Sequence, residues 1–162
     1  MIRALAWVWM GIVIGVSFLA TPVKFTADSL SRAAALDVGR ATFHALGLLE
    51  WGLTVALAAL LWRAAAAHQA PSRRALTAAA VVAAVVVLQA LWLVPALDER
   101  VASIIAGVEP PPSQLHTVYG IAEVIKVTTL WLLGLWASPI PTAERAGTSS
   151  GSKTKDQRKR RP

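Results

Sequence analysis

Three ionisable side chains lie inside apolar stretches of this 162-residue sequence, where burying a charge is costly: Glu50, Glu123 and Lys126. Gln89 adds a neutral amide in another apolar stretch. Polar groups inside a hydrocarbon layer normally face one another or a water-filled cavity, so they indicate a functional site or a contact between helices. Two carboxylates that share one ammonium titrate as a coupled group, which favours proton or cation binding as the chemistry.

A line of polar side chains leads towards these groups. His116, Tyr119, Glu123 and Lys126 are separated by three, four and three residues, and this spacing places them on one face of a helix. Arg40 stands just before another apolar stretch. We expect Arg40, His116 and Tyr119 to form an access ladder from the outer surface to the buried polar cluster.

Four apolar stretches are long enough to hold these residues within a bilayer. A hydrocarbon core about 30 Å thick is crossed by roughly 20 residues of helix. The predicted spans are residues 4–20, 41–62, 75–94 and 115–136. The sequence has 15% charged residues, well below the roughly 25% of soluble domains, and a mean hydropathy of +0.55. We therefore predict an all-α fold, with four transmembrane helices in an antiparallel bundle within residues 1–140 and a short interfacial helix at about 96–107.

The positions of the polar groups along the four spans predict a common depth. With a rise of about 1.5 Å per residue, Glu50 lies roughly 3 Å and Glu123 about 4–5 Å outward of the midpoint of its span. Gln89 and Ser17 lie about 6 Å outward by the same rule. One hypothesis is therefore a proton or cation site in a polar slab. The alternative is that these groups only join helices, with each bond worth about 0.6–2 kcal/mol.

The distribution of positive charge predicts the orientation of the chain. Eleven of the sixteen Lys and Arg residues fall on one side of the predicted spans and four on the other. The richer side should be cytoplasmic, which gives N-in and C-in topology in a bacterial inner membrane. Residues 141–162 hold most of this charge and should form a disordered basic tail on anionic lipid head groups. No nucleic-acid-binding module accompanies the charge, so no nucleic-acid partner is expected.

His44 and His116 suggest a separate hypothesis. Both lie in the first outer turn of their predicted helices, so two facing imidazoles could bind haem b or a metal ion. The alternative is a solvated pair of histidines near the interface. The sequence has no cysteine and no other ligand pattern, so we expect no metal and no other cofactor.

Gly11 and Gly15 form a GxxxG pattern in the first span. Such a pattern permits close approach of two helices, within the chain or in a homo- or hetero-oligomer. No GxSxG, HExxH or P-loop pattern occurs, so we predict no catalytic residue and do not expect an enzyme.

Four segments carry a resemblance to a known family: SFLATPVKF (17–25), GRATFHALGLLE (39–50), LWLVPALDER (91–100) and PPPSQLHTVYGIAEVIK (110–126). Over about residues 5–137 the chain resembles uncharacterised bacterial membrane proteins similar to transmembrane protein 205. The resemblance implies a four-helix membrane domain and no established activity. It marks Pro22, Phe25, Arg40, Phe43, Glu50, His116, Tyr119, Glu123 and Lys126, but not His44.

These observations leave two functional hypotheses. The first is handling of a small solute, a proton or a cation by the polar cluster. The second is a structural or accessory membrane protein in which the cluster joins the helices.

Overall fold

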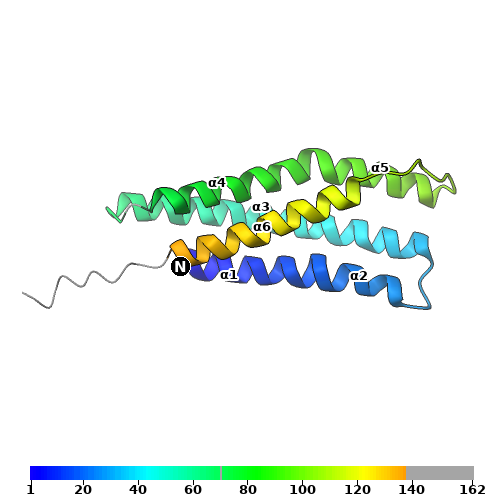
Figure 1. The fold of residues 1–162 in the computed structure, drawn as a ribbon, viewed down its shortest axis with the longest axis horizontal. Helices are drawn as coiled ribbons and strands as arrows, with labels where there is room; N and C mark the ends of the chain where they lie inside the picture. Colours follow the sequence, from blue (N-terminus) through cyan, green and yellow to red (C-terminus); the bar gives the residue numbers. More distant parts are fainter. Residues whose placement is uncertain (70, 138–162) are drawn as a thin grey trace, which may run out of the picture.

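The computed structural model describes residues 1–69 and 71–137, which form a bundle of four long helical rods (Figure 1). The first rod comprises α1 (Ile2–Val13), η1 (Ile14–Ala20), α2 (Thr21–Val23) and η2 (Lys24–Thr26). The second rod is α3 (Arg32–Ala66), and the fourth is α6 (Leu115–Trp136). The third rod comprises α4 (Arg73–Leu88), η3 (Gln89–Leu93) and α5 (Val94–Ile105). No strand occurs in the described part of the chain, so the predicted all-α fold is confirmed.

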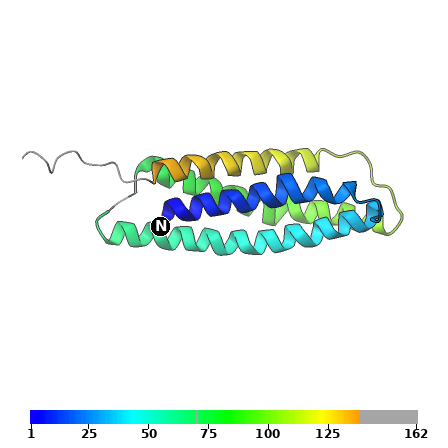
Figure 2. The same cartoon turned by 90° about the horizontal axis from the view of Figure 1, so that it is seen from below.

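Each rod contacts two neighbours that run in the opposite direction. α1 lies against α6 and α3, and α4 lies against the same two helices (Figure 2). The rods contain 25, 35, 33 and 22 residues, and each is long and apolar enough to cross a membrane. The prediction of an antiparallel bundle with four spans is therefore confirmed, and the chain has the organisation of a multi-pass membrane protein.

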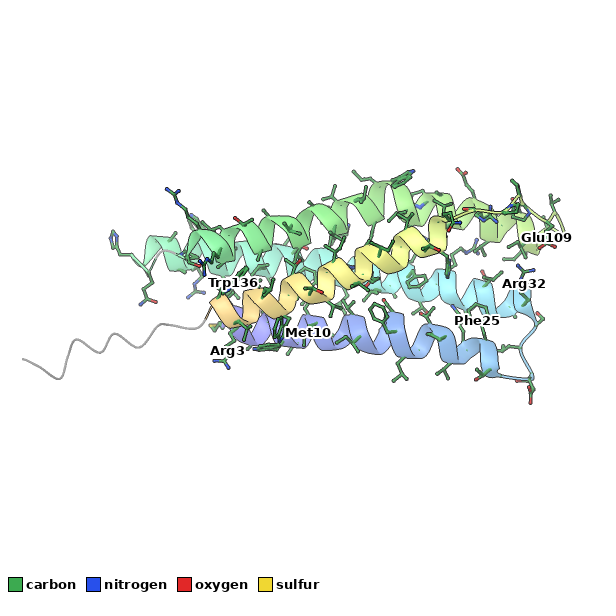
Figure 3. All side chains as sticks on the ribbon, viewed as in Figure 1. Arg3, Met10, Phe25, Arg32, Glu109 and Trp136 are labelled. Carbon is green, nitrogen blue, oxygen red and sulfur yellow. The ribbon has the colours of Figure 1, made fainter. Side chains whose placement is uncertain are left out.

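The two ends of the bundle carry different residues. Arg3 and Trp136 lie at one end, which we call the terminal end, and Arg32 and Glu109 lie at the other, which we call the distal end (Figure 3). Arg32 Nη1 and Glu109 Oε1 form an ion pair of 3.2 Å there. At about 1.5 Å per residue, the second and third rods are about 50 Å long, so they extend beyond a hydrocarbon core of about 30 Å.

Side chains capping the helix ends and an apolar core define these rods. Ser31 and Ser72 each accept a hydrogen bond from a backbone N–H in the first turn of α3 and α4, as N-cap residues do. The core of the terminal half is formed by Ala6, Trp9, Val13, Leu57, Ala75, Ala78, Ala79, Val82, Val86, Leu130 and Leu133. Gly134 also belongs to this half, and the ring of Trp7 packs against it in the space that a side chain would otherwise occupy.

The GxxxG glycines do not mediate a close contact between described helices. A Cβ atom added at Gly11 or Gly15 would have no heavy atom within 4 Å. Of the two alternatives, a close contact within the described chain is therefore not formed, because this face of the first rod points away from the other rods. Association with another chain through Gly11 and Gly15 stays a prediction.

The segment predicted as an interfacial helix at 96–107 lies mostly in α5, which continues from η3 within one rod. Pro95 lies at the start of α5, inside this continuous rod. Gly107 follows the end of this rod and has a positive φ of 80°, a backbone conformation that glycine adopts easily. The predicted basic tail, 141–162, lies outside the described residues.

Candidate functional site

The structure brings the four predicted polar residues together in one buried group, which we call the polar cluster: Glu50, Gln89, Glu123 and Lys126. Lys126 Nζ lies 2.6 and 2.8 Å from the two carboxylate oxygens of Glu50 and 2.9 Å from Glu123 Oε1. Gln89 Nε2 donates to the same Glu123 oxygen at 2.7 Å. The exposed fractions of the four residues are only 0–4%, so the cluster is shielded from solvent.

Two further side chains complete the hydrogen bonding of the cluster. Ser17 Oγ donates to Glu123 Oε2 at 3.2 Å, consistent with its expected depth. Trp9 Nε1 donates to Glu50 Oε1 at 3.1 Å and is fully buried. Nothing in the sequence indicates this position for Trp9, because a tryptophan near the end of a membrane span is normally an interfacial anchor. With these two residues, the cluster has a member on all four rods.

Two members of this network lie in π-helical segments. Ser17 lies in η1, and Gln89 is the first residue of η3. The wide turn is visible after η1, where the Thr21 N–H bonds to the Val16 carbonyl five residues earlier. A π-turn inserts one residue into the helical repeat, so it changes which side chains face the neighbouring rods, and such turns are frequent at functional sites.

A proline follows each π-helical segment by two residues. Pro22 follows η1, and Pro95 follows η3. Proline lacks an N–H and its ring clashes with the carbonyl four residues earlier, so an α-helical turn cannot pass through it unchanged. Local π-turns and hydroxyl groups can satisfy the freed backbone in a membrane helix. The Thr21 hydroxyl adds a second hydrogen bond to Val16 O, at 2.9 Å, beside the one from its own N–H. In the sequence, the available signal for these π-helical segments was a polar residue five or six positions before a proline.

A cavity of about 250 Å³ connects the polar cluster with part of the predicted access ladder. Glu123 and Ser17 line it beside Tyr119, and His116 lines it further towards the distal end. The rings of Tyr119 and Phe43 are in contact, with centroids 4.8 Å apart. We call this space the central cavity. It brings two of the three ladder residues onto one surface with Glu123.

The third ladder residue, Arg40, lies elsewhere. Arg40 lines a second cavity of about 90 Å³ near the distal end, which we call the distal cavity, and its Nη2 is 2.7 Å from Asp37 Oδ1. His116 lines both cavities, as do Phe25 and Phe43. The structure therefore divides the predicted ladder between two neighbouring spaces.

The surroundings of the polar cluster differ towards the two ends of the bundle. Towards the terminal end, the cluster borders the apolar core through Trp9 and Val13 of α1 and Leu130 of α6. Towards the distal end, Glu123 borders the central cavity. The described structure therefore offers a polar approach from the distal side, whereas the cavity of about 220 Å³ on the terminal side is lined mainly by apolar residues, including Trp9, Leu57 and Val82.

The two histidines of the haem hypothesis have different environments. His44 Nε2 lies 2.7 Å from Asp98 Oδ2, and His116 lines the two cavities. Sequence reasoning missed Asp98, which is separated from His44 by 54 positions. Across residues 1–69 and 71–137, no group of three or more His, Cys, Asp or Glu side chains is placed to hold a metal ion. The expectation of no cofactor stays a prediction, with haem b as its alternative.

Comparison with known proteins identifies a family but no activity. Neither the curated proteins nor the solved structures contain a match to this chain. The family described as "Domain of unknown function (DUF4149)" matches residues 4–103. This match includes Glu50 and Gln89 and ends before α6, which carries Glu123 and Lys126. Because it covers more than half of the sequence, the chain belongs to the DUF4149 family.

Proposed function

We propose that this protein reversibly binds a proton at the polar cluster, as part of proton-coupled handling of a small solute in the membrane. The observation that carries the proposal is the charge of the buried group. Two carboxylates, Glu50 and Glu123, surround the single ammonium of Lys126, and all three are almost fully buried. With every group ionised, the cluster has a net negative charge, which is costly in a medium of low dielectric constant. One bound proton removes that charge.

The hydrogen bonds favour a proton over a metal cation. Every carboxylate oxygen of Glu50 and Glu123 already accepts at least one hydrogen bond, so a metal ion would have to displace these donors. The side-chain oxygen of Gln89, by contrast, is buried and has no hydrogen-bond partner among the described residues. If the Gln89 amide turns over, this oxygen can accept a hydrogen bond from a proton held on Glu123.

The central cavity supplies the side from which the proton is exchanged. Ser17 and Tyr119 offer hydroxyl groups beside Glu123, and His116 extends the polar surface towards the distal end. We propose that the terminal end faces the cytoplasm of a bacterial cell, because most of the Lys and Arg residues lie on that side. Proton exchange then occurs with the outer side of the inner membrane.

A structural role is the second candidate, and the completeness of the network favours it. Six hydrogen bonds link all four rods, four of them within the polar cluster and one each from Trp9 and Ser17. At about 0.6–2 kcal/mol each, such bonds could hold a membrane bundle together without any exchange of protons. The likeness to transmembrane protein 205 supports the membrane domain and adds no activity to either candidate.

The two candidates differ in the result of replacing one carboxylate. We would record pH-dependent infrared difference spectra of the purified protein and of Glu50→Gln and Glu123→Gln. Glu99→Gln is the matched control, since Glu99 is an exposed carboxylate on α5. Proton binding predicts a protonated-carboxyl band that appears as the pH falls, persists in the control and is lost or shifted in both cluster variants.

Vesicles containing the same proteins, with a trapped pH dye and an imposed potential, then show whether the proton crosses the membrane. Flux that is lost in Glu50→Gln while the thermal unfolding temperature stays close to that of the wild type supports a transport role. Spectra and flux that are unchanged in both cluster variants, with only the unfolding temperature altered, would leave the structural role.

A further inference from the structure

The distal cavity contains a positive charge that no described residue neutralises. The Lys24 ammonium lies 5.1 Å from the centre of the Phe25 ring and 5.8 Å from that of Phe43. It also lies directly over Gly39 of α3, where a Cβ atom would overlap it. Within residues 1–69 and 71–137, no hydrogen bond or ion pair joins Lys24 to another side chain. Aromatic faces attract a cation but do not replace a counter-ion, so the site favours an anion from outside the chain.

The carboxylate that lines the distal cavity, and the one paired with Arg40 of its lining, each already have a partner. Asp98 lines the distal cavity and is bound to His44 at 2.7 Å. Asp37 is bound to Arg40, which also lines the cavity, at 2.7 Å. Lys24 is therefore the cation at this site that has neither a carboxylate nor a hydrogen-bond acceptor.

Arg100 adds a second charge to the cavity without a carboxylate partner. Its Nη1 donates to the backbone oxygen of Pro111 at 2.6 Å, and that acceptor is neutral. A phosphate or carboxylate placed in the cavity would meet Lys24 and Arg100, the residue types that bind such anions most often. A volume of about 90 Å³ is enough for such a group.

Besides Arg40, Asp98 and His116, the rest of the cavity lining is mainly apolar and lies where the rods approach the membrane surface. The apolar lining comes from Phe25, Leu36, Phe43, Val94, Leu97, Val101 and Ile104. Most of these residues belong to the distal part of α3 and to α5, which ends the third rod, and the second and third rods both exceed the thickness of the hydrocarbon core. A ligand that fits both surfaces has an anionic head and an apolar chain.

We propose that the distal cavity binds the anionic head, a phosphate or a carboxylate, of an acyl-chain amphiphile, with Lys24 as the principal cation and the chain lying along α5. This proposal does not depend on proton binding at the polar cluster. The same head chemistry occurs in membrane phospholipids, in free fatty acids and in inorganic phosphate, and the experiment separates these sources.

Binding is measured by native mass spectrometry of the full-length protein in a neutral detergent, with palmitoyl-oleoyl phosphatidylglycerol, oleate or inorganic phosphate added. Lys24→Gln removes the charge, and Arg74→Gln, an exposed position at the other end of the bundle, is its control. Gly39→Ala keeps every charge but displaces the Lys24 ammonium. Gly47→Ala is the matched control on the same helix, because a Cβ atom at Gly47 meets nothing within 4 Å. All variants retain residues 138–162, so any binding to that basic segment is the same in each.

The wild type should bind one amphiphile, and both Lys24→Gln and Gly39→Ala should weaken this binding about tenfold or more, the loss expected for one charge-assisted hydrogen bond. The two controls should bind like the wild type. Selective binding of phosphatidylglycerol identifies a phospholipid as the ligand, and selective binding of oleate identifies a free fatty acid. Binding of inorganic phosphate alone would refute the acyl-chain part of the proposal. Equal affinity of Lys24→Gln and the wild type for all three probes would overturn it, and Lys24→Gln gives this result even if Gly39→Ala fails to fold.

Discussion

Removing the ammonium of the polar cluster should destabilise the bundle strongly. Lys126→Met keeps most of the apolar stem of the side chain but removes three short contacts, two to Glu50 and one to Glu123. Both carboxylates are then left in a site with 1–3% exposure. Removing one partner of a buried ion pair typically costs about 3–5 kcal/mol. For a protein of this length, each kcal/mol shifts the unfolding temperature by roughly 2–4 °C, so the expected decrease is about 6–20 °C.

The remaining donors determine how this loss depends on Glu50. After Lys126→Met, Glu50 keeps only the Trp9 indole N–H, whereas Glu123 keeps Gln89 and Ser17. Glu50→Gln in the same chain therefore removes the less supported of the two charges. The double variant should be less destabilised than the sum of the single variants, by about 1–3 kcal/mol.

The assay is unfolding of the purified protein in mixed micelles, followed by tryptophan fluorescence, for the wild type, Lys126→Met, Glu50→Gln and the double variant. Glu99→Gln serves as the control for loss of an exposed carboxylate. A Lys126→Met variant within about 1 kcal/mol of the wild type would contradict the reasoning, because that is less than the cost of a single unpaired buried charge. Additive effects of the two substitutions would show that Lys126 and Glu50 are not coupled.

Three further predictions concern packing, topology and the haem hypothesis. The free energy of unfolding of Gly134→Ala should be about 1–3 kcal/mol lower than that of Gly120→Ala on the same helix. The methyl group added at residue 134 meets the Trp7 ring at 2.8 Å, whereas the one added at residue 120 has open space. Equal stability of the two variants in an unfolding titration would show that Trp7 moves aside without cost. The chain has no cysteine, so single cysteines at His68 and Glu109 can be labelled selectively; an impermeant maleimide added to whole cells should label the second and not the first, and the reverse would overturn the proposed orientation. Purified protein should show no Soret absorbance, and a Soret band would support the haem hypothesis.

The sequence by itself determined the four spans and the depth of their polar groups. Both follow from distance along a helix axis, which is fixed by the rise per residue and requires no knowledge of neighbouring helices. This is why Glu50, Gln89, Glu123 and Ser17, assigned to one slab from residue numbers, meet within hydrogen-bond distance or share Lys126. The all-α class follows from the same physics, because a backbone in lipid must satisfy its own hydrogen bonds.

Only the tertiary structure decided which side chains face one another at that depth. Rotation about each axis depends on packing, and it shifts wherever a π-turn precedes a proline, as before Pro22 and Pro95. The indole of Trp9 points inward to Glu50, although a tryptophan near the end of a span is normally an interfacial anchor. The same rotation leaves Gly11 without a close neighbour, while Lys24 lies over a different glycine on α3. A residue's depth is a property of its own helix, but its partner depends on how two helices are turned towards each other.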